Sequence, residues 1–441
     1  MKIVIKVAIP VYDERSGLAT VRLSTDSSAQ ADLRINFGKV LSFANQVTLD
    51  VVDFFMLSAT IYGIDRFIER RRNSIDGWSR ELKISFPVND PAKWKTISPE
   101  VSNMLSFLTG DYWEVDFYKG KFDFPAKPLE PYFSDTFAQV NLFSGGLDSL
   151  IGAIDFLTTK PNEKVLFISH YDSQMHGPFS DQKYLMSSIK EDYGGQFSYI
   201  SSLKVSLDHS TLPKETTFRS RSILFIGMAL LAAQGKKIPL VIVPENGTVS
   251  LNYPLSSSRR SACSTRTTHP TVLNMIKSIW SQLSIDTSIS NPYEFLTKGE
   301  MVANCKDQAI LKKLVDASNS CGKRGHRAHW DVPGASHCGI CMPCIYRRAS
   351  LLSILDKTTY GNDINLLNPF TRQKGQDAGA CLEFLKTPLS SRAIKQELIV
   401  NGIKELGKLD KYVGVVERTR TELKQWVKKV GNTVIKSKAG I

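Results

Sequence analysis

The chain has 441 residues, 42% of them hydrophobic and 22% charged, and its formal net charge is +13. This length allows two or three domains, each with its own core. The longest apolar stretches, residues 54–64 and 222–233, are shorter than the roughly 18 residues that a membrane span requires, so we interpret them as buried helices. The chain starts with a strand-like alternation instead of a signal peptide, so we expect a cytoplasmic protein. The positive charge favours an acidic partner: a nucleotide, a nucleic acid or an acidic protein surface.

Residues 1–130 are expected to form a small α+β domain. The alternating stretches that predict its strands are 3–10, 18–23, 81–88 and 112–118. An amphipathic helix is predicted from Thr48 to Ile68, and the arginines at 70–72 favour a solvated helix end over a nucleic-acid patch. No catalytic motif occurs here, so we interpret this domain as a candidate for partner recognition. Three prolines within 121–131 predict a linker to the next domain.

The second predicted domain, residues 131–365, contains the string Ser144-Gly145-Gly146-Leu147-Asp148-Ser149, hereafter the Gly-Gly loop. A strand is predicted before it, at 138–143, and apolar residues at helical spacing predict a helix after it. Two glycines allow a sharp turn and close approach of a ligand, while a helix N-terminus favours an anion. We therefore interpret the loop as a phosphate-binding site. The alternative is an ordinary capped turn between a strand and a helix.

Further strands and helices alternate after the Gly-Gly loop. The predicted strands are 165–169, 197–200 and 239–243, and the predicted helices are 181–191 and 218–233. This alternation predicts an α/β fold with a parallel sheet and helices on both faces. Ligands of such sheets bind at the carboxyl ends of the strands, which is where the Gly-Gly loop lies.

Four cysteines predict a metal site in the same domain. Two C-x-x-C steps connect Cys338, Cys341 and Cys344, and Cys321 lies upstream. Three thiols on a tight turn and a fourth from a preceding loop suit a closed, structural Zn²⁺ site. The histidines that could replace one thiol are His326, His329 and His337. The alternative is a set of buried, reduced cysteines.

The C-terminal region, residues 366–441, is expected to be helical and basic. Its last 51 residues contain 12 Lys and Arg against 5 Asp and Glu. Apolar residues at helical spacing between Tyr412 and Val430 form a stripe, for which we favour docking within the protein over docking on a partner. Upstream, Arg347 and Arg348 follow the last clustered cysteine and would place cations near the Gly-Gly loop if the cysteine turn packs there.

Several motifs together resemble the 7-cyano-7-deazaguanine synthase family of queuosine biosynthesis. They are the Gly-Gly loop, Arg221-Ser222, Thr297-Lys298-Gly299-Glu300 and the four clustered cysteines, in the order found in that family. The resemblance covers about residues 135–355 and implies an ATP pyrophosphatase fold. It implies that ATP and Mg²⁺ activate 7-carboxy-7-deazaguanine as an adenylate, that ammonia then gives a nitrile, and that four cysteines hold Zn²⁺.

The resemblance also implies roles for individual residues. The Gly-Gly loop would bind the phosphates of ATP, with Asp148 in the catalytic centre. Lys298 would neutralise the departing pyrophosphate, and Arg221 would line the nucleotide pocket. Four polar residues beyond a predicted strand end suit recognition of the base, although local hydrogen bonds within a loop are the alternative. These candidates are Glu245, Asn246, Arg266 and His269.

The chain departs from the short family members, which lack both residues 1–130 and the region after Pro369. The long form is similar to synthase-like proteins of bacterial antiphage operons, the Qat system and type IV CBASS. That similarity implies that the activated carboxylate is joined to the N-terminus of a partner protein from the same operon. Two alternatives remain open. One is a true nitrile-forming synthase, and the other is an inactive, zinc-bearing protein that binds nucleic acid or protein through its positive charge.

Overall fold

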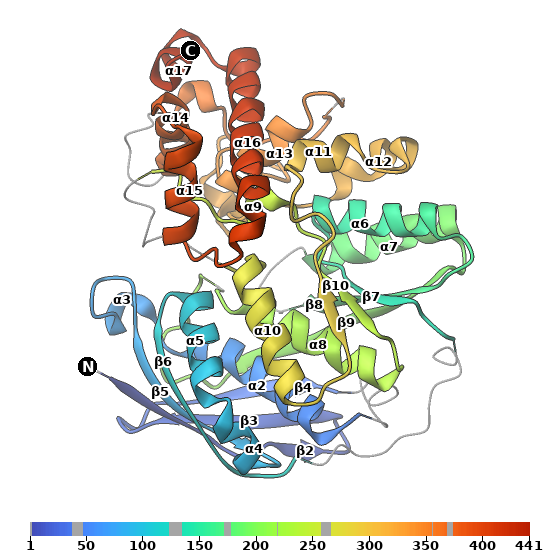
Figure 1. Ribbon diagram of the computed structural model, residues 1–441, viewed down its shortest axis with the longest axis vertical. Helices are drawn as coiled ribbons and strands as arrows, with labels where there is room; N and C mark the ends of the chain where they lie inside the picture. Colours follow the sequence, from blue (N-terminus) through green and yellow to red (C-terminus); the bar gives the residue numbers. More distant parts are fainter. Residues whose placement is uncertain are drawn as a thin grey trace.

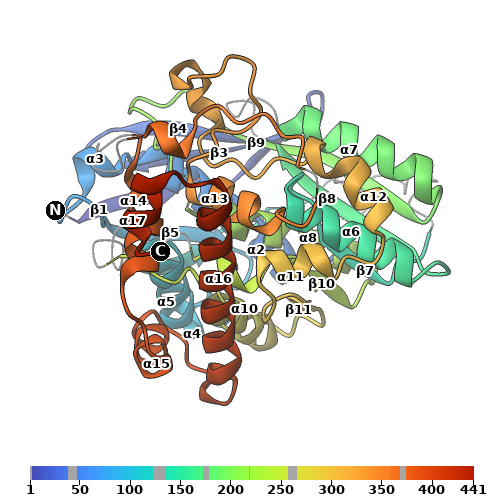
Figure 2. The same cartoon turned by 90° about the horizontal axis from the view of Figure 1, so that it is seen from above.

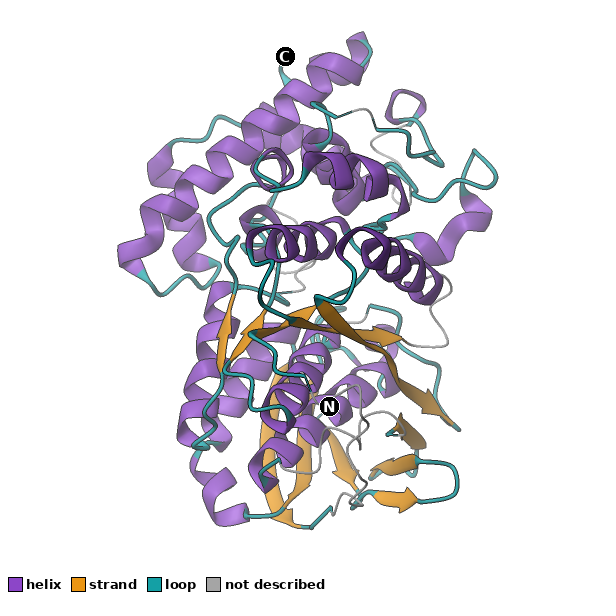
Figure 3. Ribbon diagram, turned by 90° about the vertical axis from the view of Figure 1, so that its right-hand side faces the viewer, coloured by secondary structure: helices purple, strands orange, loops and turns teal. Residues whose placement is uncertain are grey.

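The computed structural model describes residues 2–37, 47–122, 135–171, 178–217, 219–256, 266–354, 356–367 and 374–441. Most of the predicted proline linker lies outside these ranges, at 123–134. The strands occupy one half of the molecule, and a layer of helices that includes the C-terminus covers the other half (Figures 1 and 3). Within the described ranges, no helix is long and apolar enough to cross a membrane.

An eleven-stranded sheet runs through the molecule in the order β11-β10-β7-β8-β9-β4-β3-β1-β5-β6, and β2 pairs with β3. The strands are β1 (Ile3–Val7), β2 (Val11–Asp13), β3 (Leu18–Thr25), β4 (Gln30–Asn36), β5 (Glu81–Val88), β6 (Tyr112–Lys119), β7 (Gln139–Leu142), β8 (Val165–Tyr171), β9 (Phe197–Asp208), β10 (Leu240–Ile242) and β11 (Ser288–Ser290). The strands from β11 to β9 are parallel to one another, as their alternation with helices predicts. The sheet as a whole is mixed, because β4, β3 and β2 make antiparallel pairs. The protein is therefore an α/β protein with a large, mostly parallel sheet.

The N-terminal strands and the parallel strands belong to one sheet. Strand β4 pairs antiparallel with the second half of β9, with Asp32 opposite Asp208 and Ile35 opposite Val205. This pairing explains why β9 is longer than the predicted strand at 197–200. One apolar core continues across the junction and includes Leu33 of β4 and Leu166 of β8.

Helices cover both faces of the parallel strands. Successive side chains of a strand point to opposite faces, so each strand contributes to the cores on both sides. The helices near the parallel strands are α6 (Leu147–Thr159), α7 (Pro178–Tyr193), α8 (Arg221–Gly235), α9 (Gly247–Ser250), α10 (Pro270–Gln282), α11 (Lys298–Ala303), α12 (Gln308–Leu314) and α13 (Met342–Ser350). On β8, Leu166 and Ile168 join the core that contains α8, whereas Val165 and Phe167 join the core of α6 and α7. The near-continuous apolar run of β8 follows from this double burial.

The N-terminal helices differ from the prediction in their environment. Besides α4 (Pro91–Thr96) and α5 (Ser98–Thr109), this part contains α2 (Leu49–Phe67) and α3 (Arg70–Asn73). The predicted helix is present, but every residue of α2 from Val51 to Phe67 is buried, so its expected amphipathic character is wrong. It is buried on all sides because it packs against α8, β4 and β9.

A buried charge network follows α2. Arg70 is only 4% exposed and pairs with Asp65 at 2.8 Å and with Asp111 at 2.6 Å, so its predicted place at a solvated helix end is wrong. The fully buried Arg80 pairs with the same two carboxylates, at 2.7 and 2.6 Å. Asp65 also accepts hydrogen bonds from the amide and hydroxyl of Ser220, at 3.0 and 2.8 Å. Because Ser220 precedes α8, the network holds the start of α8 to the end of α2.

The C-terminal region folds back on the protein. It contains α14 (Gln376–Lys386), α15 (Ser391–Val400), α16 (Leu409–Val430) and α17 (Thr433–Ala439). The apolar stripe of α16, including Tyr412, Leu423 and Trp426, is buried in one cluster with residues of α13 and α14. Figure 2 shows α16 beside α13 and α14. The predicted docking within the protein is confirmed.

Candidate functional site

The Gly-Gly loop connects β7 to α6, which confirms the predicted strand, turn and helix. Gly145 has a φ of +81°, and a Cβ there would lie 3.1 Å from Cγ of Gln182, so both conformation and space favour glycine. Ser144 Oγ accepts a hydrogen bond from the amide of Gly146 at 3.2 Å. Ser149 Oγ donates to the carbonyl of Gly146 at 2.9 Å. The two serines therefore hold the turn in place.

Asp148, in the first turn of α6, is the centre of a buried polar cluster. Its Oδ1 lies 2.5 Å from Nζ of Lys298, the first residue of α11. Its Oδ2 accepts a hydrogen bond from Nδ2 of Asn246 at 2.6 Å. Asp148 is 7% exposed and Lys298 is 4% exposed. These three predicted site residues therefore meet at one point.

Glu245 completes this cluster as a second carboxyl group beside Asp148. Burial, followed by the charge of Asp148 and a hydrogen bond between the two carboxyl groups, raises the pKa of Glu245 well above its ordinary value. Burial alone would also raise the pKa of Asp148, but Lys298 and hydrogen bonds from Glu245 and Asn246 outweigh it and lower this pKa. The pair thus favours a proton on Glu245 over ionisation of both carboxyl groups.

Local helix caps orient the side chains of the cluster. Asn246 is the N-cap of α9, and its Oδ1 accepts a hydrogen bond from the amide of Val249 at 3.0 Å, which leaves Nδ2 for Asp148. Thr297 caps α11 in a capping box with Glu300, so Lys298 is held at the start of a helix. The string Thr-x-x-Glu that forms this box is visible in the sequence.

The sheet topology explains why the cluster assembles. Asp148 follows β7, Asn246 follows β10, and Lys298 comes from the segment after β11. These strands are parallel neighbours, so their carboxyl ends lie at one edge of the sheet. Asn291, just after β11, donates from Nδ2 to the carbonyl of Glu245 at 2.7 Å and ties two of these loops together.

The other predicted site residues lie in different surroundings. Arg221 begins α8 with its guanidinium 5.3 Å from the ring of Phe225, and it acts with burial to lower the pKa of His170 at the end of β8. Arg266 stacks on the ring of Phe107 at 4.4 Å and donates to its carbonyl at 3.2 Å. The contacts described for Arg221 and Arg266 are therefore not with Asp148.

His269 also has local partners. Its Nδ1 accepts a hydrogen bond from the amide of Thr271 at 3.2 Å and caps α10, and its ring contacts Phe107. Burial and then the charge of Arg266 lower the pKa of His269 to about 3, so the ring is neutral at physiological pH. The four residues predicted to recognise a base thus divide into Glu245 and Asn246 beside Asp148, and Arg266 and His269 beside Phe107.

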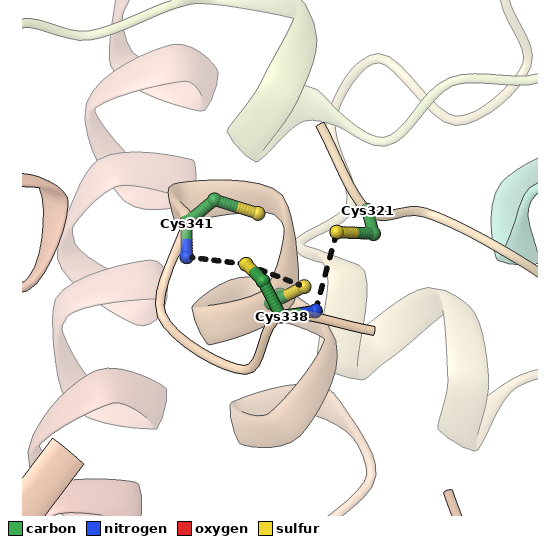
Figure 4. Close-up of side chains that lie close together, drawn as sticks. Cys321, Cys338 and Cys341 are labelled. Atoms are coloured by element: carbon green, nitrogen blue, oxygen red, sulfur yellow. Dashed lines mark hydrogen bonds between the residues drawn. The ribbon is translucent and has the colours of Figure 1, made fainter. Parts of the chain in front are cut away.

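The four predicted cysteines form one cluster, in which all four Sγ atoms lie within 4.8 Å of one another. Cys321 and Cys338 approach each other from different segments, with Cys341 on the adjoining turn (Figure 4). A tetrahedral Zn²⁺ site with Zn–S bonds of about 2.3 Å has roughly 3.8 Å between sulfurs. The Sγ atoms of Cys338 and Cys344 are 3.8 Å apart. The cluster can therefore bind Zn²⁺, and the predicted convergence of four thiols is confirmed.

The three histidines considered as alternative ligands have other environments. The ring of His337 accepts a hydrogen bond from the amide of Ser320 at 3.4 Å and contacts the hydroxyl of Ser336 at 2.9 Å. His326 and His329 are exposed. Among the described residues, the metal-binding group consists of the four cysteines alone.

The segment that leads into Cys321 contacts the Gly-Gly loop, a link that the sequence pattern does not reveal. The amide of Asn319 donates to the carbonyl of Gly145 at 2.9 Å, and Oγ of Ser320 accepts from the amide of Leu147 at 3.4 Å. The segment that leads into the cysteine cluster therefore supports the loop. Their position just before a predicted metal ligand is the only sequence signal that points to Asn319 and Ser320.

Arg347 and Arg348 have described partners around the cysteine cluster rather than in the Gly-Gly loop itself. Arg347 is fully buried and donates to Oγ of Ser318 at 2.8 Å and to the carbonyl of Val315 at 2.6 Å. Arg348 lies over the ring of Trp426, with 5.3 Å to its centroid. Both arginines hold elements together around the metal cluster.

Comparison with known proteins adds no family assignment. A scan against protein-family models and a search of curated proteins both find no match. Functional interpretation therefore depends on the two clusters themselves, one around Asp148 and one of cysteines.

Proposed function

We propose that the protein is an ATP-dependent ligase that activates a carboxylate as an adenylate and transfers the acyl group to an amine. The observation that carries this proposal is the convergence of Asp148, Lys298 and Asn246 beside the Gly-Gly loop. A glycine turn before a helix suits phosphates, and a buried lysine beside it suits the charge that develops when a phosphate bond breaks.

The proposed reaction has two steps. A carboxylate oxygen attacks the α-phosphorus of ATP, the bond between the α-phosphorus and the bridging oxygen breaks, and pyrophosphate leaves. An amine nitrogen then attacks the acyl carbon of the adenylate, the bond from this carbon to the AMP oxygen breaks, and the nitrogen loses one proton. The products are an amide, AMP and pyrophosphate.

The residues of the first cluster have distinct roles in this proposal. Gly145 and Gly146 allow the phosphates to approach the backbone, and Lys298 stabilises the departing pyrophosphate. Asp148 and Glu245 are adjacent oxygen donors of the kind that Mg²⁺ prefers, and this ion supplies positive charge to a polyphosphate when bound. Cation binding there would release the proton held by Glu245. Zn²⁺ bound by the cysteines would have a structural role.

For the substrate, we propose a 7-deazaguanine carboxylate, with the N-terminal amine of a partner protein in antiphage defence as the acceptor. The support is the motif resemblance together with the place of Glu245 and Asn246, whose carboxyl and amide groups lie at the strand ends. Such groups can pair with the edge of a purine-like base. The extra strands of residues 1–130 and the basic helices of 366–441 provide surface for a partner.

The test is to incubate the purified protein with ATP, Mg²⁺ and 7-carboxy-7-deazaguanine and to measure AMP and pyrophosphate. Intact masses of candidate partner proteins from the same operon identify a conjugate. A free nitrile product instead would establish the synthase alternative. If neither AMP nor pyrophosphate forms, with or without partners, the ligase proposal is wrong and a binding role through the positive charge takes its place.

A further inference from the structure

Glu422 of α16 is bonded to both chain neighbours of Lys298. One carboxylate oxygen accepts a hydrogen bond from the hydroxyl of Thr297, and the other accepts one from the amide of Gly299 at 3.2 Å. A Cβ at Gly299 would lie 2.5 Å from Glu422, so glycine permits this close approach. A side chain from the C-terminal region thus fixes the position of the first turn of α11.

Two further contacts join the same stretch of α16 to the site. Arg418 pairs with Glu300 of α11 at 2.6 Å. The hydroxyls of Thr419 and Thr248 lie 2.6 Å apart, and Thr248 belongs to the short helix that Asn246 caps. Helix α16 therefore touches both segments that bring partners to Asp148.

Buried side chains of α16 hold the helix in place and so fix the position of these contacts. On either side of Glu422, Thr419 and Leu423 are buried, and Trp426 is buried one turn further on. In Figure 1 α16 lies among the C-terminal helices, and it contacts α9 and α11. Because the helix is fixed by its own core, the carboxylate of Glu422 is held at a defined place relative to Lys298.

We propose that Glu422 is a positioning residue of the active site and that α16 is a part of the site. The inference rests on the proposed function, because it assigns Lys298 to the transition state. Glu422 bonds to the backbone and hydroxyl next to Lys298, not to its ammonium group. It therefore acts by fixing the direction in which Lys298 leaves α11, so that Nζ reaches Asp148 and the Gly-Gly loop.

The test compares Glu422→Ala with Glu422→Gln and with the control Glu417→Ala. Glu417 lies on the same helix and is exposed, and its described hydrogen bond is with the hydroxyl of Ser391 of α15 at 2.7 Å. We expect Glu422→Ala to lower kcat for AMP formation about tenfold to a hundredfold, with less change in KM for ATP, because misplacing a catalytic group costs rate. Glu422→Gln keeps an oxygen acceptor and is expected to recover most of kcat, and Glu417→Ala is expected to match the wild type.

A second readout does not depend on activity. Lysine acetylation by acetic anhydride, followed by peptide mass spectrometry, reports the accessibility of Lys298. We expect faster labelling of Lys298 in Glu422→Ala and unchanged labelling in Glu417→Ala. Inactive wild-type protein would refute the proposed function, while the labelling still tests the position of Lys298. Unchanged kcat and labelling in folded Glu422→Ala would refute the inference, as would equal losses in Glu417→Ala. If Glu422→Ala does not fold, Glu422→Asp keeps the charge, shortens the reach and serves in its place.

Discussion

Lys298 and Asp148 are 150 positions apart in the chain, yet they form a buried ion pair with 2.5 Å between Nζ and Oδ1. Removing one partner from such a pair leaves a charge in a medium that solvates it poorly. The pair joins the first turn of α6 to the first turn of α11. Loss of either residue should therefore destabilise the site.

The first prediction concerns this ion pair. Lys298→Met and Asp148→Asn should each lower the free energy of unfolding by about 3–5 kcal/mol, because each leaves a buried group without its partner charge. The double variant should lose less than the sum of the two losses. Urea denaturation of all four proteins measures the coupling. Additive losses would show that the two side chains do not interact.

The same variants have an expected effect on activity. Either substitution should lower AMP formation by at least about a hundredfold, the usual effect of removing one group that stabilises transition-state charge. The rate is measured with saturating ATP and the deazaguanine carboxylate. Wild-type rates in Asp148→Asn would contradict the assignment of the Gly-Gly loop to phosphate binding.

The second prediction concerns pH. Because burial and Asp148 raise the pKa of Glu245, folded protein keeps a proton that the unfolded chain loses near pH 4.3. Stability from this group is thus complete below pH 4.3 and is lost as pH rises through the raised pKa, by at most about 1.4 kcal/mol per pH unit. Asp148, with its lowered pKa, contributes the opposite slope, but only at acidic pH.

Glu245→Gln should remove this pH dependence. Its stability relative to the wild type should rise with pH above about pH 4.3 until the pH passes the raised pKa of Glu245, as measured by urea denaturation at each pH. If the difference in unfolding free energy between the two proteins does not change with pH, Glu245 is already ionised in the folded protein. Such a result would also argue against the shared proton in the Asp148 cluster.

The third prediction concerns the cysteine cluster. Cys341→Ser should abolish Zn²⁺ binding and destabilise the protein, because the binding free energy of a structural zinc site is also folding free energy. Metal analysis by plasma mass spectrometry measures the Zn²⁺ content. The buried Cys305 lies outside the cluster, so Cys305→Ser should retain the metal. Full metal content in Cys341→Ser would remove this residue from the site.

Zinc removal should also affect the Gly-Gly loop. Asn319 and Ser320 bond to the loop and lead directly into Cys321, so a chelator that extracts the metal should weaken ATP binding. Isothermal titration of ATP into the metal-free and reconstituted protein gives the difference. Equal affinities for ATP in the two forms would show that the contact between the cysteine segment and the Gly-Gly loop does not affect ATP binding.

The fourth prediction concerns the N-terminal charge network. Arg80→Met should destabilise the protein by about 3–5 kcal/mol, because Asp65 and Asp111 would lose their ion pairs with Arg80 and keep those with Arg70. Arg71 is exposed, and Arg71→Met should change stability by no more than about 0.5 kcal/mol. Thermal and urea unfolding of both variants test this contrast. Equal effects would mean that the network contributes nothing to stability.

Sequence patterns predict the parts of this fold that local signals encode. The strand, turn and helix around the Gly-Gly loop follow from periodicity and from two glycines, and three of the four metal ligands follow from their spacing. The pairing of β4 with β9 leaves no such trace, since it depends on strands far apart in the chain. The same limit explains the wrong prediction for Arg70. Its local sequence indicates a solvated helix end, and its partner Asp111 lies 41 residues later in the chain.

The candidate site shows the same division. Asp148, Lys298, Glu245 and Asn246 lie in short motifs that the sequence displays, and parallel strands bring them together. Glu422 belongs to a helix whose visible pattern is an apolar stripe, so nothing local distinguishes it from the neighbouring Glu417. Only the packing of α16 on α11 distinguishes the proposed positioning role of Glu422 from the surface position of Glu417.

The pairing of β4 with β9 has a consequence for synthesis on the ribosome. When β4 emerges, its partner has not been translated, and at about 5–20 residues per second the delay is on the order of ten to thirty seconds. Throughout this interval the backbone edge of β4 that later pairs with β9 is uncovered and open to wrong partners. The nascent N-terminal third therefore exposes an unpaired strand edge until β9 is made, and we expect chaperones to act on the chain at this stage.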